Sequence, residues 1–196
     1  MKRWRVDGDP SGDVIDELAS VLRAGGVALL PTDTIYGLHA VATDERAIAR
    51  IRTMKGRDDD KPFVVIASSV EQLRTLGAVV PEQLSGIWPA PLTAILTSGE
   101  TTIAARIPAL TWLRALLDRT GPLVSTSANR SGEPPVTSPD ALANDLQNAL
   151  DALLDQGPRE GKPSTIVDFT GAEPKLIREG DPAFAQILRK TLRKAL

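Results

Sequence analysis

The stretch Val27-Ala28-Leu29-Leu30-Pro31, followed at once by Thr32-Asp33-Thr34-Ile35-Tyr36-Gly37-Leu38, sets the pattern of this chain. A short apolar run that ends at a proline is typical of a buried strand. A helix is predicted directly before it, beginning at Asp9, Pro10 or Ser11 and ending at Gly25-Gly26. The apolar face of that helix is formed by Val14, Leu18, Val21 and Leu22. A helix followed by a buried strand indicates an α/β fold.

The same alternation continues along the rest of the chain. From apolar periodicity and from the residues at element ends, we predict further helices at 44–56, 68–76, 81–88, 112–121, 139–148 and 182–192. Strands are predicted at 63–67, 92–96, 103–107, 123–125, 149–154, 165–169 and 175–178. Two strand pairs have connections too short for a helix, which favours antiparallel pairing. We therefore expect α/β architecture, with a twisted, open, mixed β-sheet and helices on its faces, in one domain over residues 1–196.

Composition removes several classes of function. The chain has 196 residues, no cysteine and one histidine, His39, which excludes cysteine nucleophiles, iron–sulfur clusters, cysteine-ligated zinc and two-histidine chemistry. A net charge of −2 argues against a protein that coats long stretches of nucleic acid. There is no run of about 18 apolar residues, and the basic N-terminus has no apolar signal core after it. We therefore expect a cytoplasmic protein with no membrane association.

Two polar segments follow predicted strands, where ligands of open α/β sheets bind. Residues 31–38 place two threonines and an aspartate in a loop that ends in glycine, which suits a small polar ligand. The simpler interpretation is a turn that satisfies its own backbone. Residues 125–132 offer hydroxyl and amide groups for phosphate oxygens, or only a turn before Pro134-Pro135. His39 is interpreted as a structural histidine rather than a catalytic one.

Cationic side chains are found in two further places. Residues 55–62 carry three cations within seven residues, which suits a triphosphate, although a solvated helix end explains them more simply. Residues 163–168 and 177–180 lie at the ends of one strand pair, and Arg106 ends another strand as a candidate carboxylate clamp. Each of these can equally be a surface residue. A P-loop is excluded because the Gly-x-x-x-x-Gly-Lys-Ser/Thr motif does not occur.

The order and spacing of these motifs resemble the YrdC-type threonylcarbamoyl-AMP synthase family in its short, single-domain form. The motifs are Pro-Thr-Asp-Thr-Ile-Tyr-Gly-Leu at 31–38, Lys-Gly-Arg at 55–57 with Lys-Pro at 61–62, Trp-Pro-Ala-Pro-Leu-Thr at 88–93, Ala-Arg-Ile-Pro at 105–108, Ser-Thr-Ser-Ala-Asn-Arg-Ser-Gly at 125–132, Pro-Ser-Thr-Ile-Val-Asp at 163–168 and Ile-Arg-Glu-Gly at 177–180. The resemblance runs from about residue 14 to residue 180. It implies a sheet around a central concave, positively lined cavity, as in YrdC and DHBP synthase-like folds.

The resemblance implies a nucleotidyltransferase reaction in which ATP, L-threonine and bicarbonate give threonylcarbamoyl-AMP and pyrophosphate. The product feeds the formation of N6-threonylcarbamoyladenosine at tRNA position 37, through separate downstream transferase proteins. Mg²⁺ is expected to accompany ATP, with no metal held by the protein alone. Weak RNA binding by the cavity is a further expectation.

The resemblance also implies roles for individual residues. The predicted catalytic residues are Lys55 and Arg57. The predicted ATP contacts are Lys55, Arg57, Lys61, Thr102, Ser125, Ser127, Asn129 and Arg178. The predicted threonine contacts are Thr34, Arg106 and Ser164.

Some positions depart from the family pattern, and alternative functions stay open. Ile66 and Leu110 stand where some members of the family have histidine, which bears on threonine recognition, and Asp58 and Ala90 replace a common proline and glycine. One alternative is a YrdC-like paralogue that makes a different carbamoyl-adenylate. Another is a non-catalytic RNA-binding module, against which the net charge and the few aromatic residues argue.

Overall fold

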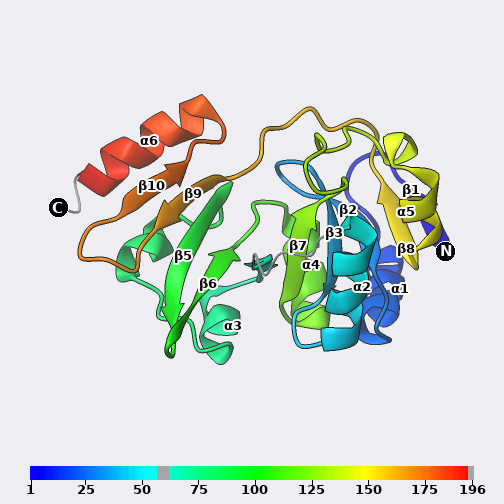
Figure 1. Ribbon diagram of the computed structural model, residues 1–196, viewed down its shortest axis with the longest axis horizontal. Helices are drawn as coiled ribbons and strands as arrows, with labels where there is room; N and C mark the ends of the chain where they lie inside the picture. The colour runs from blue at the N-terminus through cyan, green and yellow to red at the C-terminus, as the bar shows by residue number, and fades with distance from the viewer. Residues whose placement is uncertain (57–61, 194–196) are drawn as a thin grey trace.

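A computed structural model describes residues 1–56 and 62–193, and the predictions for Arg57 and Lys61 lie outside the described residues. The described strands form one continuous mixed β-sheet (Figure 1). In their spatial order, the strands are β1 (Lys2–Arg5), β8 (Ala152–Asp155), β2 (Ala28–Pro31), β3 (Tyr36–Val41), β7 (Leu123–Ser127), β4 (Val64–Ile66), β6 (Thr101–Arg106), β5 (Leu92–Ser98), β9 (Thr165–Asp168) and β10 (Lys175–Arg178). The expected open mixed sheet is confirmed.

The strand pairing agrees with the sequence expectation. β5 pairs with β6 and β9 pairs with β10 in antiparallel fashion, as the short connections predict. Parallel pairs join β1 to β8, β8 to β2, β4 to β6 and β5 to β9, and the remaining neighbours are antiparallel. The sheet therefore mixes both pairings along its width and is not doubly wound.

Several of the described helices begin or end at residues that favour helix ends. They are α1 (Gly12–Arg23), α2 (Glu45–Lys55), α3 (Val70–Thr75), α4 (Thr111–Thr120), α5 (Asn144–Asn148) and α6 (Pro182–Arg193). The Asp44 carboxylate accepts from the backbone N–H groups of Arg46 and Ala47, both at 3.0 Å, and caps α2. Gly56 ends α2 in the left-handed conformation (φ 58°), which favours glycine. None of the described helices is long and apolar enough to cross a membrane.

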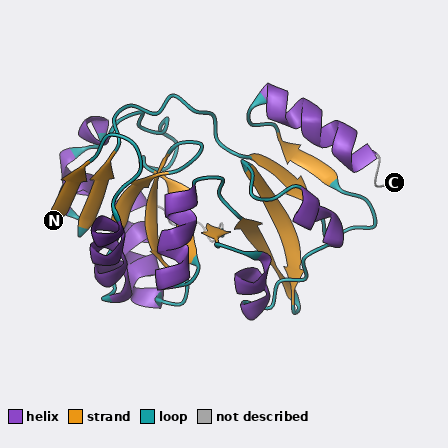
Figure 2. Ribbon diagram, turned by 180° about the vertical axis from the view of Figure 1, so that it is seen from behind, coloured by secondary structure: helices purple, strands orange, loops and turns teal. Residues whose placement is uncertain are grey.

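Alternation along the central strands creates two cores, one on each face of the sheet. Leu29 of β2 packs with α2 and α5, whereas its neighbours Ala28 and Leu30 pack with α1 and α4. Views from opposite sides show helices over this half of the sheet (Figures 1 and 2). A third core joins β5, β6 and β9 to α3 and α6. The molecule thus has a three-layer half and a second half with its own core, and they share one sheet.

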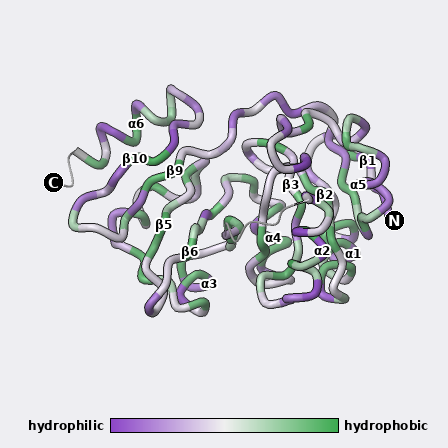
Figure 3. Tube along the Cα trace, in the orientation of Figure 1, coloured by the Kyte–Doolittle hydropathy of each residue, from purple (hydrophilic) through white to green (hydrophobic). Residues whose placement is uncertain are grey.

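The connection from β8 to β9, residues 156–164, runs between the two halves across the top of Figure 1. It is largely hydrophilic, in contrast to the apolar strands that it joins (Figure 3). We call residues 156–164 the strap. The Tyr36 hydroxyl anchors the start of the strap, because it donates to the Gly157 carbonyl at 2.8 Å and accepts from the Gln156 N–H at 3.0 Å. The strap therefore has a fixed position beside the start of β3.

Several element predictions are wrong in detail. Strand β3 takes up residues that the sequence analysis places in a loop: Tyr36, Leu38 and Ala40 alternate toward one core, but Gly37 and His39 between them prevent the continuous apolar run that marks the other predicted strands. The edge strand β1 is also missed, since three of its four residues are Lys or Arg. The helix predicted at 81–88 is a five-residue 3-10 helix, η1 (Glu82–Gly86). The helix predicted at 139–148 divides into a 3-10 turn, η2 (Pro139–Ala141), and the short α5.

Candidate functional site

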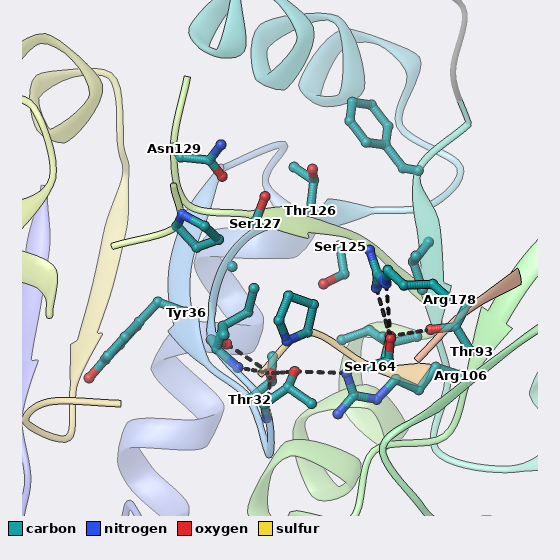
Figure 4. Close-up of a pocket in the computed structure, with 18 of the residues that line it drawn as sticks. Thr32, Tyr36, Thr93, Arg106, Ser125, Thr126, Ser127, Asn129, Ser164 and Arg178 are labelled. Carbon is teal, nitrogen blue, oxygen red and sulfur yellow. Dashed lines mark hydrogen bonds between the residues drawn. The ribbon is translucent and has the colours of Figure 1, made fainter. Parts of the chain in front are cut away.

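A cavity of about 370 Å³ lies where the ends of strands from both halves of the sheet meet (Figure 4). This volume falls within the range of small-molecule sites. Its wall contains two arginines, Arg106 and Arg178, and one asparagine, Asn129. Hydroxyl groups come from Thr32, Thr34, Thr93, Ser125, Thr126, Ser127 and Ser164. The cavity thus brings together residues 31–38, 125–132 and the 163–168/177–180 strand pair with Arg106, and Pro62 of the fourth predicted segment also lines it.

The loop between β2 and β3 holds Arg106 by two contacts. The Arg106 guanidinium donates to Thr34 Oγ1 at 2.9 Å and forms an ion pair with the Asp33 carboxylate. Both side chains of the ion pair are nearly buried, with 7% and 9% of their surfaces exposed. The other Asp33 carboxylate oxygen accepts from the Ala109 N–H at 3.1 Å, so Asp33 joins Arg106 to the segment that begins α4. Such a held guanidinium is suited to a planar anion such as a carboxylate.

A second set of contacts forms around Ser164, at the end of the strap. The hydroxyls of Ser164 and Thr93 lie 2.8 Å apart, and both residues are buried. The guanidinium of Arg178, the last residue of β10, donates to the Ser164 carbonyl oxygen at 2.9 and 3.2 Å. Figure 4 shows these three side chains on one side of the cavity, with Arg106 nearby. Strands β5 and β10 and the end of the strap therefore contribute to one hydroxyl-and-guanidinium wall.

The two arginines influence each other electrostatically. Burial lowers the pKa of the Arg178 guanidinium, and the positive charge of Arg106 lowers it further. Both groups remain cationic at neutral pH because arginine is effectively always protonated. Asp33 balances the charge of Arg106, whereas Arg178 donates to the carbonyl and hydroxyl oxygens of Ser164, which carry no charge. An anion that enters the cavity would therefore be attracted by the guanidinium of Arg178.

Lys55 lies behind the opposite wall and holds it together. Its ammonium donates to the carbonyl oxygens of Ser127 and Asn129 at 2.7 and 2.8 Å, and to the Asn129 side-chain oxygen at 3.4 Å. The residue is 4% exposed and is not among those that line the cavity. The Asn129 side-chain N–H donates to the Glu133 carbonyl oxygen at 2.7 Å. The structure therefore gives Lys55 a positioning contact, and its predicted catalytic role stays a prediction.

We expect Lys55→Met to destabilise the protein by about 2 kcal/mol, because it removes charge-assisted hydrogen bonds from buried carbonyls while keeping most of the side-chain volume. It should also make the loop after β7 more mobile, since that loop loses its anchor. Urea denaturation and amide hydrogen exchange of the loop measure the two effects. Lys190→Met, at an exposed position of α6, is the matched control and should change stability by less than about 0.5 kcal/mol. Equal behaviour of the two variants would contradict the positioning contact.

His39 lies directly behind the cavity wall. Residues 39 and 125 are opposite each other in the antiparallel β3–β7 pair, so their side chains lie on the same face. The His39 Nε2 atom is 3.1 Å from the Ser125 hydroxyl oxygen, and His39 has no solvent exposure. Burial lowers the pKa of His39 to about 4, and the positive Arg106 contributes to the lowering. The imidazole is therefore neutral at physiological pH.

This buried neutral imidazole predicts a loss of stability in mild acid. The unfolded chain binds a proton at His39 near pH 6.5, whereas the folded protein does so only near pH 4. The stabilisation from the neutral imidazole is fully present above pH 6.5 and decreases as the pH falls. At pH 4 the free energy of unfolding is therefore lower by about 3 kcal/mol. Urea denaturation between pH 7 and pH 4 should show this loss, and His39→Gln should lack this part of it. An identical pH dependence in the two proteins would contradict the prediction.

The strap packs directly against the Thr34 loop. A Cβ atom added to Gly161 would overlap the carbonyl oxygen of Thr34, so only glycine permits this approach. Gly180, just after β10, is equally confined, because a Cβ there would overlap the Pro163 carbonyl oxygen. Because of these two glycines, the backbone of the strap and the backbone after β10 lie close to residues that line the cavity.

The structure separates the predicted site residues into four groups. The residues that it places at the cavity are Thr34, Arg106, Ser125, Ser127, Asn129, Ser164 and Arg178. Lys55 lies behind the wall. Thr102 is exposed near the start of β6, four residues along the strand from Arg106, and is not among the residues that line the cavity, so its predicted ATP contact stays a prediction. Arg57 and Lys61 lie outside the described residues.

The positions that depart from the family pattern lie in different surroundings. Ile66 is 2% exposed and lines the cavity, where it presents an apolar side chain. Leu110 packs against the core formed by α1 and α4 and is not among the lining residues. Asp33 was predicted only as part of the polar loop 31–38, and Thr93 was not among the predicted site residues although the motif at 88–93 ends on it. A threonine inside an otherwise apolar strand was the available signal for Thr93.

Among the described residues, no group of three or more His, Asp or Glu side chains is placed to hold a metal ion. Glu133 is the acidic residue among those that line the cavity.

Comparison with known proteins connects this geometry to a family. The family model Sua5_yciO_yrdC, described as telomere recombination, matches residues 20–180. The chain is 36% identical over 178 residues to the threonylcarbamoyl-AMP synthase of Pyrococcus abyssi, covering 83% of this chain and 52% of that protein. It is 34% identical to the Stutzerimonas stutzeri protein of the same name, covering 81% and 94%. The crystal structure of P. abyssi Sua5 complexed with L-threonine superimposes with a TM-score of 0.84 at 33% identity, covering 92% of this chain and 58% of that one.

The relatives differ from this chain in length. The chain spans 52% of the P. abyssi relative and 60% of a Bacillus subtilis relative that is 34% identical over 95% of this chain. The similarity therefore concerns the part of those proteins that matches this fold.

Proposed function

Since the chain belongs to the Sua5/YciO/YrdC family, we propose that it is a threonylcarbamoyl-AMP synthase, a nucleotidyltransferase that converts ATP, L-threonine and bicarbonate to threonylcarbamoyl-AMP and pyrophosphate. The proposal is supported by two curated relatives of that name and by the related Sua5 structure that contains L-threonine. The product would serve N6-threonylcarbamoyladenosine formation in tRNA, carried out by downstream transferases. A cytoplasmic location follows from that role.

The observation that carries the proposal is that Arg106 and Arg178 share one hydroxyl-lined cavity. The reaction joins two anionic substrates, an amino acid with a carboxylate and a nucleotide with a triphosphate. Two guanidiniums with hydroxyl groups around them supply the donors that carboxylate and phosphate oxygens need. Because the Asp33 carboxylate partly neutralises Arg106, that end of the cavity suits a ligand group with a single negative charge.

Each end of the cavity suits one substrate. Arg106 and Thr34 would hold the threonine carboxylate, with Ser164 on the same substrate and Ile66 against its methyl group. Ser125, Ser127, Asn129 and Arg178 would contact ATP. The threonine amine adds to the carbon of bicarbonate to give a carbamate with loss of water. A carbamate oxygen then attacks the α-phosphorus as the bond to pyrophosphate breaks.

The protein's share of catalysis in this proposal is alignment and charge stabilisation. Holding carbamate and α-phosphate in one cavity replaces a collision in solution with a fixed approach. Arg178 would stabilise charge that develops on the phosphate oxygens. Mg²⁺ would accompany ATP and screen its phosphates, held chiefly by substrate oxygens. The predicted catalytic roles of Lys55 and Arg57 belong to this proposal as well.

The test is pyrophosphate release by the purified protein. With ATP, Mg²⁺ and bicarbonate, release should require L-threonine, and L-serine should be a poorer substrate because it lacks the methyl group that Ile66 would contact. Mass spectrometry should identify threonylcarbamoyl-AMP in the reaction. Pyrophosphate release that does not depend on threonine would indicate a paralogue that makes another carbamoyl-adenylate. No turnover, together with salt-sensitive RNA binding, would indicate an RNA-binding module instead.

A further inference from the structure

We propose that His39 is a positioning residue for Ser125: its Nε2–H donates to the Ser125 oxygen and directs the serine hydroxyl proton at an anionic oxygen of the substrate. The inference deepens the proposed function and rests on it for the identity of the substrates. Nothing in the comparisons assigns a role to this position. The ligand chemistry required is an anionic oxygen, carried either by the threonine carboxylate or by an ATP phosphate.

The first support is the geometry of the β3–β7 pair. The register places residue 39 opposite residue 125, and the Nε2–Oγ distance of 3.1 Å is that of a hydrogen bond. Ser125 lines the cavity, whereas His39 is completely buried behind it. The imidazole can therefore act on a ligand in the cavity through the serine hydroxyl.

The second support is the space that Gly37 leaves for the imidazole. A Cβ atom at Gly37 would be 2.9 Å from His39 Cε1 and 3.3 Å from Nε2, closer than these atoms can pack comfortably. The ring therefore occupies the volume that a side chain at residue 37 would need. Strand β3 thus has Gly37 at the cavity and the imidazole of His39 two residues further along the strand. This arrangement holds the imidazole in one orientation against Ser125.

The third support is the direction of the hydrogen bonds. A serine hydroxyl has one proton to donate, and an anionic oxygen only accepts. When Ser125 donates to the anion, its oxygen can take a hydrogen bond only from an Nε2–H. Nδ1 of His39 is buried and has no hydrogen-bond partner within the described part of the chain.

With leucine or alanine at position 39, the Ser125 hydroxyl would be free to rotate. Part of the free energy of its hydrogen bond to the substrate would then be offset by the entropy lost when the hydroxyl is fixed. Arg106 is the charged group whose field acts on the imidazole, and a neutral ring avoids a third cation beside Arg106 and Arg178. His39 therefore contributes direction to the hydroxyl and no charge to the cavity.

The first experiment uses the fact that the chain contains one histidine. Long-range proton–nitrogen NMR of the ¹⁵N-labelled protein at pH 7 reports its tautomer without ambiguity. We expect the neutral form with the proton on Nε2. Its Nε2 signal should move when either L-threonine with bicarbonate or α,β-methylene-ATP is added, and that movement should be lost in Ser125→Ala. A proton on Nδ1 in the ligand-bound protein would overturn the proposal.

The second experiment compares binding by calorimetry. His39→Leu, which keeps an apolar volume without a donor, should weaken the ligand that Ser125 contacts by about tenfold, whereas His39→Gln, which keeps a donor, should stay within about threefold. Weaker threonine binding identifies the carboxylate as the ligand, and weaker binding of the ATP analogue identifies a phosphate. The double variant His39→Leu/Ser125→Ala should bind no more weakly than Ser125→Ala.

These outcomes separate the inference from the proposed function. Unchanged binding of both ligands in His39→Leu overturns the positioning role even when the unmodified protein releases pyrophosphate normally. An unmodified protein that releases no pyrophosphate with threonine overturns the proposed function. In that case the tautomer and the response of the imidazole to each ligand still decide the inference, because neither measurement requires turnover.

Discussion

Replacing Arg106 with alanine should lower kcat/KM for L-threonine by about a hundredfold and destabilise the protein by about 3–5 kcal/mol. The catalytic loss follows because the substrate carboxylate loses the guanidinium proposed to bind it. The loss of stability has a separate cause: the Asp33 carboxylate stays nearly buried without its cation. Threonine-dependent pyrophosphate release and urea denaturation measure the two effects.

A second substitution at Asp33 distinguishes these causes. The double variant Arg106→Ala/Asp33→Ala removes both charges, so it should recover much of the lost stability without recovering activity. Arg119→Ala is the matched control, because it breaks an ion pair with Asp16 whose side chains are 36% and 64% exposed, and it should cost less than about 1 kcal/mol. An Arg106→Ala protein with a normal KM for threonine would contradict the proposed carboxylate contact.

Gly161→Ala should lower activity by about a hundredfold, although residue 161 carries no reactive group. The added methyl group would overlap the Thr34 carbonyl oxygen, so either the strap or the Thr34 loop must move. Thr34 shares its hydroxyl with Arg106, and Ser164 ends the strap, so either movement displaces proposed threonine contacts. The same overlap should cost about 1–3 kcal/mol of stability. The KM for threonine and the urea midpoint measure both effects.

Gly171→Ala provides the control for the glycine substitution. Gly171 has no positive φ, and a Cβ atom there would meet its nearest neighbour at 3.7 Å, an ordinary van der Waals contact. It should leave kinetics and stability close to those of the unmodified protein. Comparable losses in both variants would show that alanine in any of these loops is harmful, and that the contact between strap and Thr34 loop has no special importance.

The elements that local chemistry controls were predictable. Ser11 and Asp44 mark helix starts by capping free N–H groups, and Gly56 ends a helix where a positive φ is needed. The β5–β6 and β9–β10 pairs follow from connection length alone. Strand β3 was missed because Gly37 and His39 prevent a continuous apolar run, although Tyr36, Leu38 and Ala40 alternate as a strand requires. Gly37 lines the cavity and His39 lies directly behind its wall, where function and local pattern conflict.

The sequence by itself determined the family, the α/β architecture and the segments from which the site is built. Only the tertiary structure decided which side chains of those segments meet. It brings Thr93 to the cavity and leaves Thr102 near the far end of β6, it places Lys55 behind the wall, and it pairs His39 with Ser125. The physical reason is that a side chain's direction depends on strand register and on pairing between distant segments. Local periodicity reveals neither of these, because both are set when the whole sheet assembles.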